Sequence, residues 1–183
     1  STLSNHWGIT TGDFDNDGLT DLMVGAQFAG ETILGRFLAL KNLGNFSFRD
    51  VTEVWNLDFG WPQQFSDMAA QADINGDGRL DFFLQGHTQG HKIWENKSQS
   101  NDYLYVRATG QKGQHTQFGA TIKIRMSSSQ TLVGMDFVGA GPGYQVKGEY
   151  ENHFGLQEDS VYEVEVVFPS EPGHLIKVDK VVN

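Results

Sequence analysis

Two nine-residue segments of this 183-residue chain carry acidic and amide side chains at the same positions. The first loop, residues 13–21, reads Asp-Phe-Asp-Asn-Asp-Gly-Leu-Thr-Asp, and the second loop, residues 73–81, reads Asp-Ile-Asn-Gly-Asp-Gly-Arg-Leu-Asp. Oxygen-bearing side chains stand at loop positions 1, 3, 5 and 9 in both. Calcium takes about six to eight oxygen ligands at about 2.3–2.6 Å, and alternating carboxylates on a tightly curved loop supply several of them. The spacing therefore predicts two calcium sites.

The predicted side-chain ligands share loop positions 1, 3, 5 and 9: Asp13, Asp15, Asp17 and Asp21 in the first loop, and Asp73, Asn75, Asp77 and Asp81 in the second. A glycine follows position 5 in each loop and permits the backbone to curl, because it takes a positive φ without a Cβ clash. The alternative is a pair of turns at hairpin ends, since Asp, Asn and Gly dominate turns. That alternative does not explain why acidic groups are crowded together twice, whereas a bound cation would relieve their repulsion.

The residues after each loop distinguish these segments from EF-hands. An EF-hand loop closes with a glutamate at position 12 and is flanked by helices. Here position 12 is Val24 in the first copy and Leu84 in the second, each within a short apolar run. Such runs favour buried β-strands, so we expect each loop to connect two strands.

The two loops begin 60 positions apart, which is the scale of a propeller blade or solenoid unit. In the first repeat the pattern predicts strands near residues 7–11, 22–26, 37–41 and 46–51, with a hairpin turn at 43–45. The second repeat predicts strands at 68–72, 82–85 and 92–96 and gives no clear fourth strand. After about residue 101, alternating segments at 103–107, 120–124, 131–133 and 161–167 predict a small β-sandwich or barrel.

The first half of the chain resembles the FG-GAP or VCBS repeats of integrin-type β-propellers. The resemblance rests on Asp-x-Asp-x-Asp-Gly-x-x-Asp before an apolar strand, and on the Leu-Lys-Asn-x-Gly-x-Phe-x-Phe-x-Asp-Val-Thr run at residues 40–52. It implies that the backbone carbonyls of Leu19 and Arg79 join the calcium ligands of the two loops. The second loop departs from the family pattern at Asn75, which lowers the ligand charge and predicts weaker calcium binding there.

Several segments of the second half resemble the ASPIC/UnbV domain of proteins similar to cartilage acidic protein. The matching pieces are Phe-Gly-Ala at 118–120, Gly-Pro-Gly-Tyr at 141–144, His-Phe-Gly-Leu at 153–156 and Phe-Pro-Ser at 168–170. Phe168 stands where that family commonly has tryptophan. The sequence thus predicts an all-β protein, with two blade-like calcium-binding repeats in residues 1–98 and an ASPIC/UnbV-like β domain in residues 99–183.

The charge balance and composition narrow the classes of partner and compartment. The formal net charge is −10 and no basic cluster is present, which disfavours nucleic acid and anionic membranes as partners. No apolar run approaches the roughly 20 residues of a membrane-spanning helix. The predicted calcium sites favour an extracellular location, because weak calcium modules fill at the roughly 0.1–1 mM calcium found outside cells.

The sequence carries no motif typical of an enzyme. It has no Gly-x-Ser-x-Gly elbow, no phosphate-binding loop and no dinucleotide fingerprint, and we predict no catalytic residue. His87 and His91 are four residues apart, but the intervening Thr-Gln-Gly segment follows a predicted strand, which favours a loop with incidental histidines over a zinc site.

Two further sequence features admit a structural and a functional interpretation. The aromatic segment 55–65 could stack on sugar rings, but we favour a plug between the two repeats, because large aromatic side chains provide much of the burial energy in small β domains. Asn45 and Asn96 stand in Asn-x-Ser sequons and are candidate glycosylation sites.

These observations favour a non-catalytic, extracellular, calcium-binding structural or adhesion protein. Two blades do not close a propeller, which typically has about 4–8, and unpaired strand edges invite another chain. The expected partners are therefore proteins or further copies of this chain, in an oligomer or a filament. The alternatives are a calcium-dependent glycan-binding module and the C-terminal fragment of a larger secreted propeller enzyme.

Overall fold

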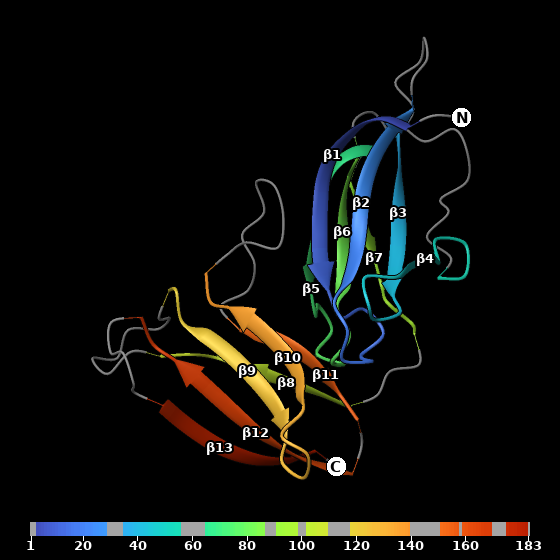
Figure 1. Ribbon diagram of the computed structural model, residues 1–183. Helices are drawn as coiled ribbons and strands as arrows, with labels where there is room; N and C mark the ends of the chain where they lie inside the picture. The colour runs from blue at the N-terminus through green and yellow to red at the C-terminus, as the bar shows by residue number, and fades with distance from the viewer. Residues whose placement is uncertain are drawn as a thin grey trace. The chain divides into compact units, whose positions relative to one another are not determined.

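The computed structural model describes residues 3–28, 35–55, 65–86, 91–98, 102–109, 118–139, 151–157, 159–169 and 175–182. Within these ranges the chain forms thirteen strands in four antiparallel sheets and contains no helix (Figure 1). It divides into two compact units, the first containing β1–β7 and the second containing β8–β13 together with residues 15–19 of the first loop. The prediction of an all-β protein is confirmed.

The first sheet has the order β1-β2-β3-β4 and is a meander of neighbouring antiparallel strands. Its strands are β1 (Leu3–Gly12), β2 (Asp21–Phe28), β3 (Gly35–Asn42) and β4 (Phe48–Asp50). Gly12 of β1 pairs with Asp21 of β2, so the first loop is the connection of this hairpin. The sequence predicted the position of β1, β2 and β3, since each expected segment lies inside the observed strand.

The fourth strand of this sheet is shorter than predicted because the preceding turn is longer. Gly44, Asn45 and Phe46 all have positive φ, at 79°, 51° and 56°. The amide of Leu43 donates to the carbonyl of Ser47 at 2.8 Å and closes the turn. Phe46 is fully exposed within it. The expected strand over 46–51 is therefore corrected to Phe48–Asp50, because a left-handed backbone cannot continue a β ladder.

The second sheet repeats the first hairpin and adds one strand, in the order β5-β6-β7. Its strands are β5 (Phe65–Ala72), β6 (Asp81–Gly86) and β7 (Lys92–Trp94). Ala72 pairs with Asp81, so the second loop connects β5 and β6 as the first connects β1 and β2. The expected strand over 92–96 ends at Trp94 instead, because the backbone amide of Asn96 turns to donate to Asp81 at 2.8 Å.

One hydrophobic core joins the two sheets of the first unit. Its buried members come from both: Phe14, Met23, Phe37, Ala39, Val51, Ala69, Leu80, Phe82 and Leu84. The ring of Phe14 meets that of Phe82 edge-on at 4.7 Å and that of Trp55 at 6.4 Å. Burying each large apolar side chain contributes about 1.5–3 kcal/mol. Trp55 therefore packs at the junction of the repeats, whereas residues 56–64 of the predicted aromatic plug lie outside the described residues.

Polar contacts reinforce this junction between β1 and β5. The Thr10 hydroxyl donates a hydrogen bond to the carbonyl of Ala69. The Gln71 side-chain amide donates to the carbonyl of Thr11 at 2.8 Å. The two hairpins that present the loops are thus attached to each other along their first strands.

The second unit contains a four-stranded sheet, ordered β10-β9-β12-β13, and the two-stranded pair β11-β8. The strands are β8 (Asp102–Val106), β9 (Thr121–Met126), β10 (Leu132–Phe137), β11 (Asn152–Leu156), β12 (Ser160–Val167) and β13 (Leu175–Val182). The described strands form two layers and no closed barrel (Figure 1). Of the sequence alternatives, the sandwich-like arrangement fits and the barrel does not.

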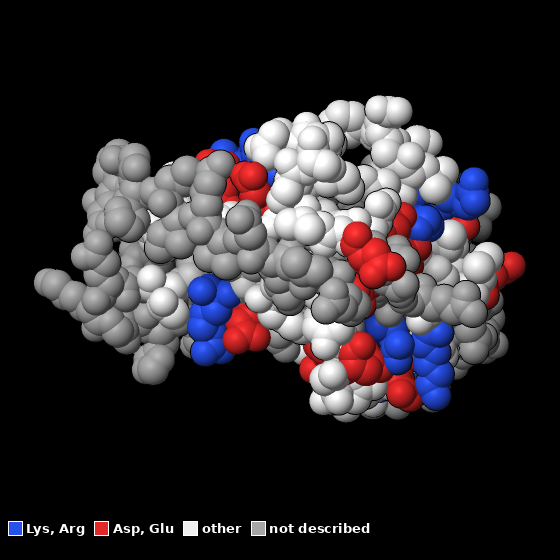
Figure 2. All heavy atoms as spheres, turned by 90° about the horizontal axis from the view of Figure 1, so that it is seen from below, with Lys and Arg blue, Asp and Glu red and all other residues white. Residues whose placement is uncertain are grey.

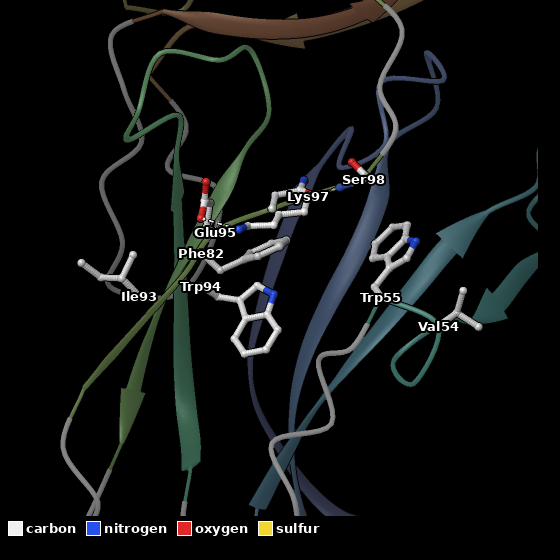
Figure 3. Close-up of a pocket in the computed structure, with 9 residues that line it drawn as sticks. Val54, Trp55, Phe82, Ile93, Trp94, Glu95, Lys97 and Ser98 are labelled. Atoms are coloured by element: carbon white, nitrogen blue, oxygen red, sulfur yellow. Dashed lines mark hydrogen bonds and ion pairs between the residues drawn. The ribbon is translucent and has the colours of Figure 1, made fainter.

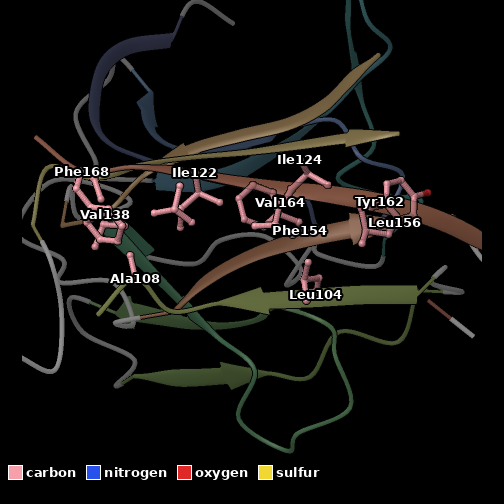
Figure 4. Packing of buried hydrophobic residues seen from close by; sticks show 12 residues of the cluster. Leu104, Ala108, Ile122, Ile124, Val138, Phe154, Leu156, Tyr162, Val164 and Phe168 are labelled. Atoms are coloured by element: carbon pink, nitrogen blue, oxygen red, sulfur yellow. The ribbon is translucent and has the colours of Figure 1, made fainter. Parts of the chain in front are cut away.

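The core of the second unit lies between these two layers, as Figure 4 shows. Alternate residues of β9 and β12 point inward, including Ile122, Ile124, Tyr162 and Val164, which are all buried. Phe154 of β11 closes the core from the other layer. The alternation predicted β9 and β12 well, but β11 and β13 were missed. The segment of β11 reads His-Phe-Gly-Leu, which has no clear period of two.

Charged side chains of both signs are interspersed on the face shown in Figure 2. In the second unit, Lys123 and Glu165 stand opposite each other on β9 and β12, and their charged atoms are 3.9 Å apart. The guanidinium of Arg125 approaches the same carboxylate at 3.7 Å. Cross-strand pairs of this kind contribute roughly 0.2–1 kcal/mol each. Among the described residues there is no helix long and apolar enough to cross a membrane.

Candidate metal centre

Three carboxylates of the first loop converge in the structure. One oxygen from each of Asp13, Asp15 and Asp21 lies within 4.8 Å of the others. Two ligands on opposite sides of a calcium ion, each at about 2.3–2.6 Å, are about 4.6–5.2 Å apart. The cluster is therefore compact enough for one calcium ion to contact all three carboxylates. No other three acidic or histidine side chains within the described ranges lie this close together.

Asp21 is fixed in this cluster by two backbone hydrogen bonds. It is fully buried. Its Oδ2 accepts from the amide of Phe14 at 3.1 Å, and its Oδ1 accepts from the amide of Asn42 at 2.7 Å. The closing residue of the loop is thus oriented before any ion binds.

Asp17 and Leu19 complete the predicted ligand set of the first loop. Asp17 is not one of the three converging carboxylates, and its Oδ1 accepts from the amide of Leu19 at 2.9 Å. Between them Gly18 has a φ of 88°, and the preceding Asn16 has a φ of 56°. The glycine after position 5 therefore adopts the left-handed backbone for which its residue type was predicted.

The carboxylate of Asp73 in the second loop is occupied by the backbone of its own loop. Its Oδ1 accepts from the amides of Gly76 at 2.7 Å and Asp77 at 3.0 Å, and its Oδ2 accepts from Gly78 at 2.8 Å. Asp81 repeats the arrangement of Asp21, because its Oδ2 accepts from the amide of Ile74 at 3.0 Å. Asp81 is also almost fully buried, with 2 % of its surface exposed.

The carboxylate of Asp77 in the second loop is bound by two neighbouring side chains that donate hydrogen bonds to it. Its Oδ2 accepts from the Asn75 amide at 2.9 Å and forms an ion pair with the Arg79 guanidinium. Arg79 is held from its other side, since its Nε donates to the carbonyl of Asn96 at 2.8 Å. Position 7 is Leu19 in the first loop, so the first loop has no such internal cation. The guanidinium supplies to Asp77 the positive charge that a bound cation would supply.

An asparagine at or just after the end of the third strand of each sheet supports the closing aspartate, and sequence reasoning missed this role. The amide of Asn42 donates to Asp21, and the side-chain amide of Asn42 donates to the carbonyl of Thr20 at 2.9 Å. Likewise, the backbone amide of Asn96 donates to Asp81 at 2.8 Å, and its side-chain amide donates to the carbonyl of Leu80 at 3.1 Å. A sequence signal existed, because both asparagines follow an apolar and a charged residue, in Leu-Lys-Asn and Trp-Glu-Asn.

The two sequons lie in different environments. Asn45 is exposed in the turn between β3 and β4. Asn96 is buried, with 8 % of its surface exposed, and the Nδ2 atom that would carry a glycan donates two hydrogen bonds. A glycan replaces one of the two Nδ2 hydrogens, so at Asn96 in the folded chain it would remove at least one of these bonds. Of the two histidines considered above, His91 packs beside the ring of Phe83 at 5.5 Å, and His87 lies outside the described residues.

A hollow of about 470 Å³ opens beside β7 and the segment that follows it. Its lining includes Trp55, Trp94 and Phe82, with Glu95, Lys97 and Ser98 along one side. In Figure 3 the indole rings of Trp55 and Trp94 lie at different parts of this hollow, and Lys97 is joined to Glu95. Ligand pockets typically have volumes of about 300–1,000 Å³ and combine aromatic walls with a few polar groups.

The two loops meet the requirements of a calcium ion to different degrees. The first loop fits, because hard oxygen donors already converge and Asp21 is pre-oriented. The second loop contains the same kinds of donor, but Asp77 would have to leave Arg79 before it could face a cation. Bound calcium would supply charge neutralisation and a rigid cross-link of the loop.

An FG-GAP repeat is matched at residues 7–38. The match begins in β1, includes the whole first loop and β2, and ends in β3. It supports the FG-GAP part of the resemblance, and no comparison supports the ASPIC/UnbV part. Searches of curated proteins and of solved structures return no match.

Proposed function

We propose that the first half of the chain, residues 1–98, is a calcium-stabilised module that binds two ions. Asp13, Asp15, Asp17 and Asp21 with the Leu19 carbonyl hold one ion; Asp73, Asn75, Asp77 and Asp81 with the Arg79 carbonyl hold the other. The observation that carries the proposal is the convergence of three carboxylates in the first loop, inside the segment matched as an FG-GAP repeat. The second site is the weaker one, because Asn75 brings less charge and Arg79 competes for Asp77.

The protein acts outside the cell as a non-catalytic structural or adhesion protein that binds other proteins or further copies of itself. FG-GAP repeats are structural repeats of integrin-type extracellular proteins, which supports this role. Residues 99–183 form its ASPIC/UnbV-like β domain. Exposed edges support protein contacts: strand β10 ends its sheet and exposes Leu132, Met135 and Phe137 by 45, 49 and 50 %. An apolar edge strand is a template for another chain.

Calorimetric titration and thermal melting test the calcium proposal. A ligand present at about 100 times its dissociation constant stabilises a protein by about 2.7 kcal/mol. We expect EDTA to lower the melting temperature by more than 5 °C, since about 1 kcal/mol corresponds to roughly 4–8 °C in a domain of this size. Asp17→Ala and Asp77→Ala should each remove about one bound ion. An unchanged melt in EDTA, or two ions bound by both variants, would contradict the assignment.

The hollow between Trp55 and Trp94 supports a second candidate function, calcium-dependent glycan binding. Indole rings stack on the apolar faces of sugars, while Glu95, Lys97 and Ser98 could bind hydroxyl groups. A glycan array probed with the protein in millimolar calcium tests this function. We expect Trp94→Ala to abolish any glycan signal, with Phe46→Ala, at a fully exposed position, as the matched control. Equal binding by both variants would exclude this hollow.

A further inference from the structure

The side chain of Asn96 lies between the two loops and is bonded to both. Its Nδ2 donates to the carbonyl of Leu80 at 3.1 Å, at position 8 of the second loop. The same Nδ2 donates to the carbonyl of Phe14 at 2.7 Å, at position 2 of the first loop. The backbone amide of Asn96 donates to Asp81. A single buried residue thus connects the closing end of one loop with the opening end of the other.

Asn42 provides an internal comparison for Asn96. In both residues the backbone amide bonds the closing aspartate, Nδ2 bonds the carbonyl before it, and Oδ1 accepts from the amide two residues later. In Asn42 these three bonds serve its own loop and hairpin. The bond from Asn96 to Phe14 spans 82 positions and is additional to this shared pattern.

A small shift of Phe14 would move the carboxylates that converge in the first loop. It stands between Asp13 and Asp15, two of the three converging carboxylates, and its amide donates to the third, Asp21. Its carbonyl accepts a second bond from the Ser98 hydroxyl at 3.2 Å. Its buried ring packs on Phe82, which directly follows Asp81. The backbone and side chain of Phe14 are both attached to the structure that holds the second loop.

The physical consequence is a short path of packed and hydrogen-bonded groups from Asp81 through Asn96 to Phe14. Buried polar groups of this kind resist rearrangement, because breaking one bond leaves a desolvated donor or acceptor. A cation that tightens the second loop therefore restrains Phe14 in the position in which Asp13 and Asp15 face Asp21. By linkage, an ion in the first loop favours the second to the same degree.

We propose that Asn96 couples the two loops, so that calcium bound by one raises the affinity of the other. This inference rests on the proposed function, in which both loops bind calcium. Asn96 is a positioning residue in this arrangement, because it acts through Phe14 and Asp81. We expect calcium in one loop to raise the calcium affinity of the other by a factor of about three to ten. Linked sites typically show factors of about 5–150, so this coupling lies at the weak end.

Calcium titrations followed by the amide NMR signals of Gly18 and Gly78 report each loop separately. Disabling the second loop with Asp77→Ala should weaken calcium binding at Gly18 by three- to tenfold in the wild-type background. In an Asn96→Ala background the same change should have no effect on Gly18, which completes a double-mutant cycle. Asn42→Ala is the matched control: it should weaken the first loop yet leave the effect of Asp77→Ala intact.

The outcomes separate this inference from the function on which it rests. Calcium binding at both loops, with no effect of Asp77→Ala on Gly18, would overturn the coupling and leave the calcium sites in place. Absence of binding at both loops would overturn the proposed function and the coupling together. If Asn96→Ala does not fold, Ser98→Ala removes the other donor to Phe14 and should reduce the coupling factor by about half. An unchanged factor in Ser98→Ala would then overturn the route through Phe14.

Discussion

The first and second loops hold their closing aspartates alike but use their other polar side chains differently. Asp21 and Asp81 each accept one hydrogen bond from the amide of loop position 2 and one from the amide of an asparagine at or just after the end of the third strand. Around this common frame, the first loop gathers three carboxylates. The second directs Asp77 to Asn75 and Arg79.

This difference teaches that a repeated motif fixes a loop's shape more firmly than its charge. The frame depends on backbone amides, which every residue except proline supplies. The charge depends on positions 3 and 7, where the second loop has an amide and a guanidinium in place of a carboxylate and an apolar side chain. An internal cation satisfies an acidic group without a metal. Identical spacing therefore permits two ion sites of different strength.

The largest loss of stability is expected from removing the closing aspartates, Asp21 and Asp81, whose hydrogen bonds form the common frame of the two loops. Asp21→Ala and Asp81→Ala each leave two backbone amides without their acceptor, and a lost buried hydrogen bond costs about 1–3 kcal/mol. We expect either variant to lose about 2–6 kcal/mol of unfolding free energy, even in EDTA. Urea unfolding measures the loss, with Glu53→Ala, an exposed site in the same unit, as control. If either variant lost less than about 1 kcal/mol of unfolding free energy, the hydrogen bonds of the closing aspartate would not stabilise both loops alike.

Removing the internal cation should make the second loop resemble the first. Arg79→Leu, which introduces the residue found at position 7 of the first loop, should raise calcium affinity at the second loop by about tenfold, or about 1.4 kcal/mol. Calorimetry in calcium measures the change. Arg79→Lys keeps the charge and should change the affinity by less than about threefold. Equal affinities in wild type and Arg79→Leu would mean that the ion pair with Asp77 does not oppose calcium.

The smallest effect on calcium affinity is expected from changing Glu95, which lies near the second loop. Glu95 approaches the Asn75 amide at 3.5 Å and pairs with Lys97 at 3.2 Å, but both charged side chains are more than half exposed. Exposed ion pairs contribute little, typically about 0–1 kcal/mol. Glu95→Gln should therefore change calcium affinity by less than about twofold. A larger loss in calorimetry would make Glu95 a ligand and would enlarge the second site.

The predictions from sequence succeeded where the determining residues are close together in the chain. Both loops, the strands that flank them and the alternating strands β9 and β12 were located correctly, because strand periodicity and turn chemistry are local properties. Local patterns failed at Phe46, which continues the alternation of a strand but adopts a left-handed turn. They also failed at Asn96, where a sequon coincides with a buried side chain.

The sequence by itself determined that oxygen-bearing side chains stand at matching positions of two loops between strands, because each set is contained in nine residues. Only the tertiary structure decided which carboxylates converge, which are paired, and how the loops are connected. Asn42 reaches Asp21 across 21 positions and Asn96 reaches Phe14 across 82. Contacts of that separation depend on how hairpins return and how sheets pack, since buried polar groups select their partners only when the surrounding core has formed.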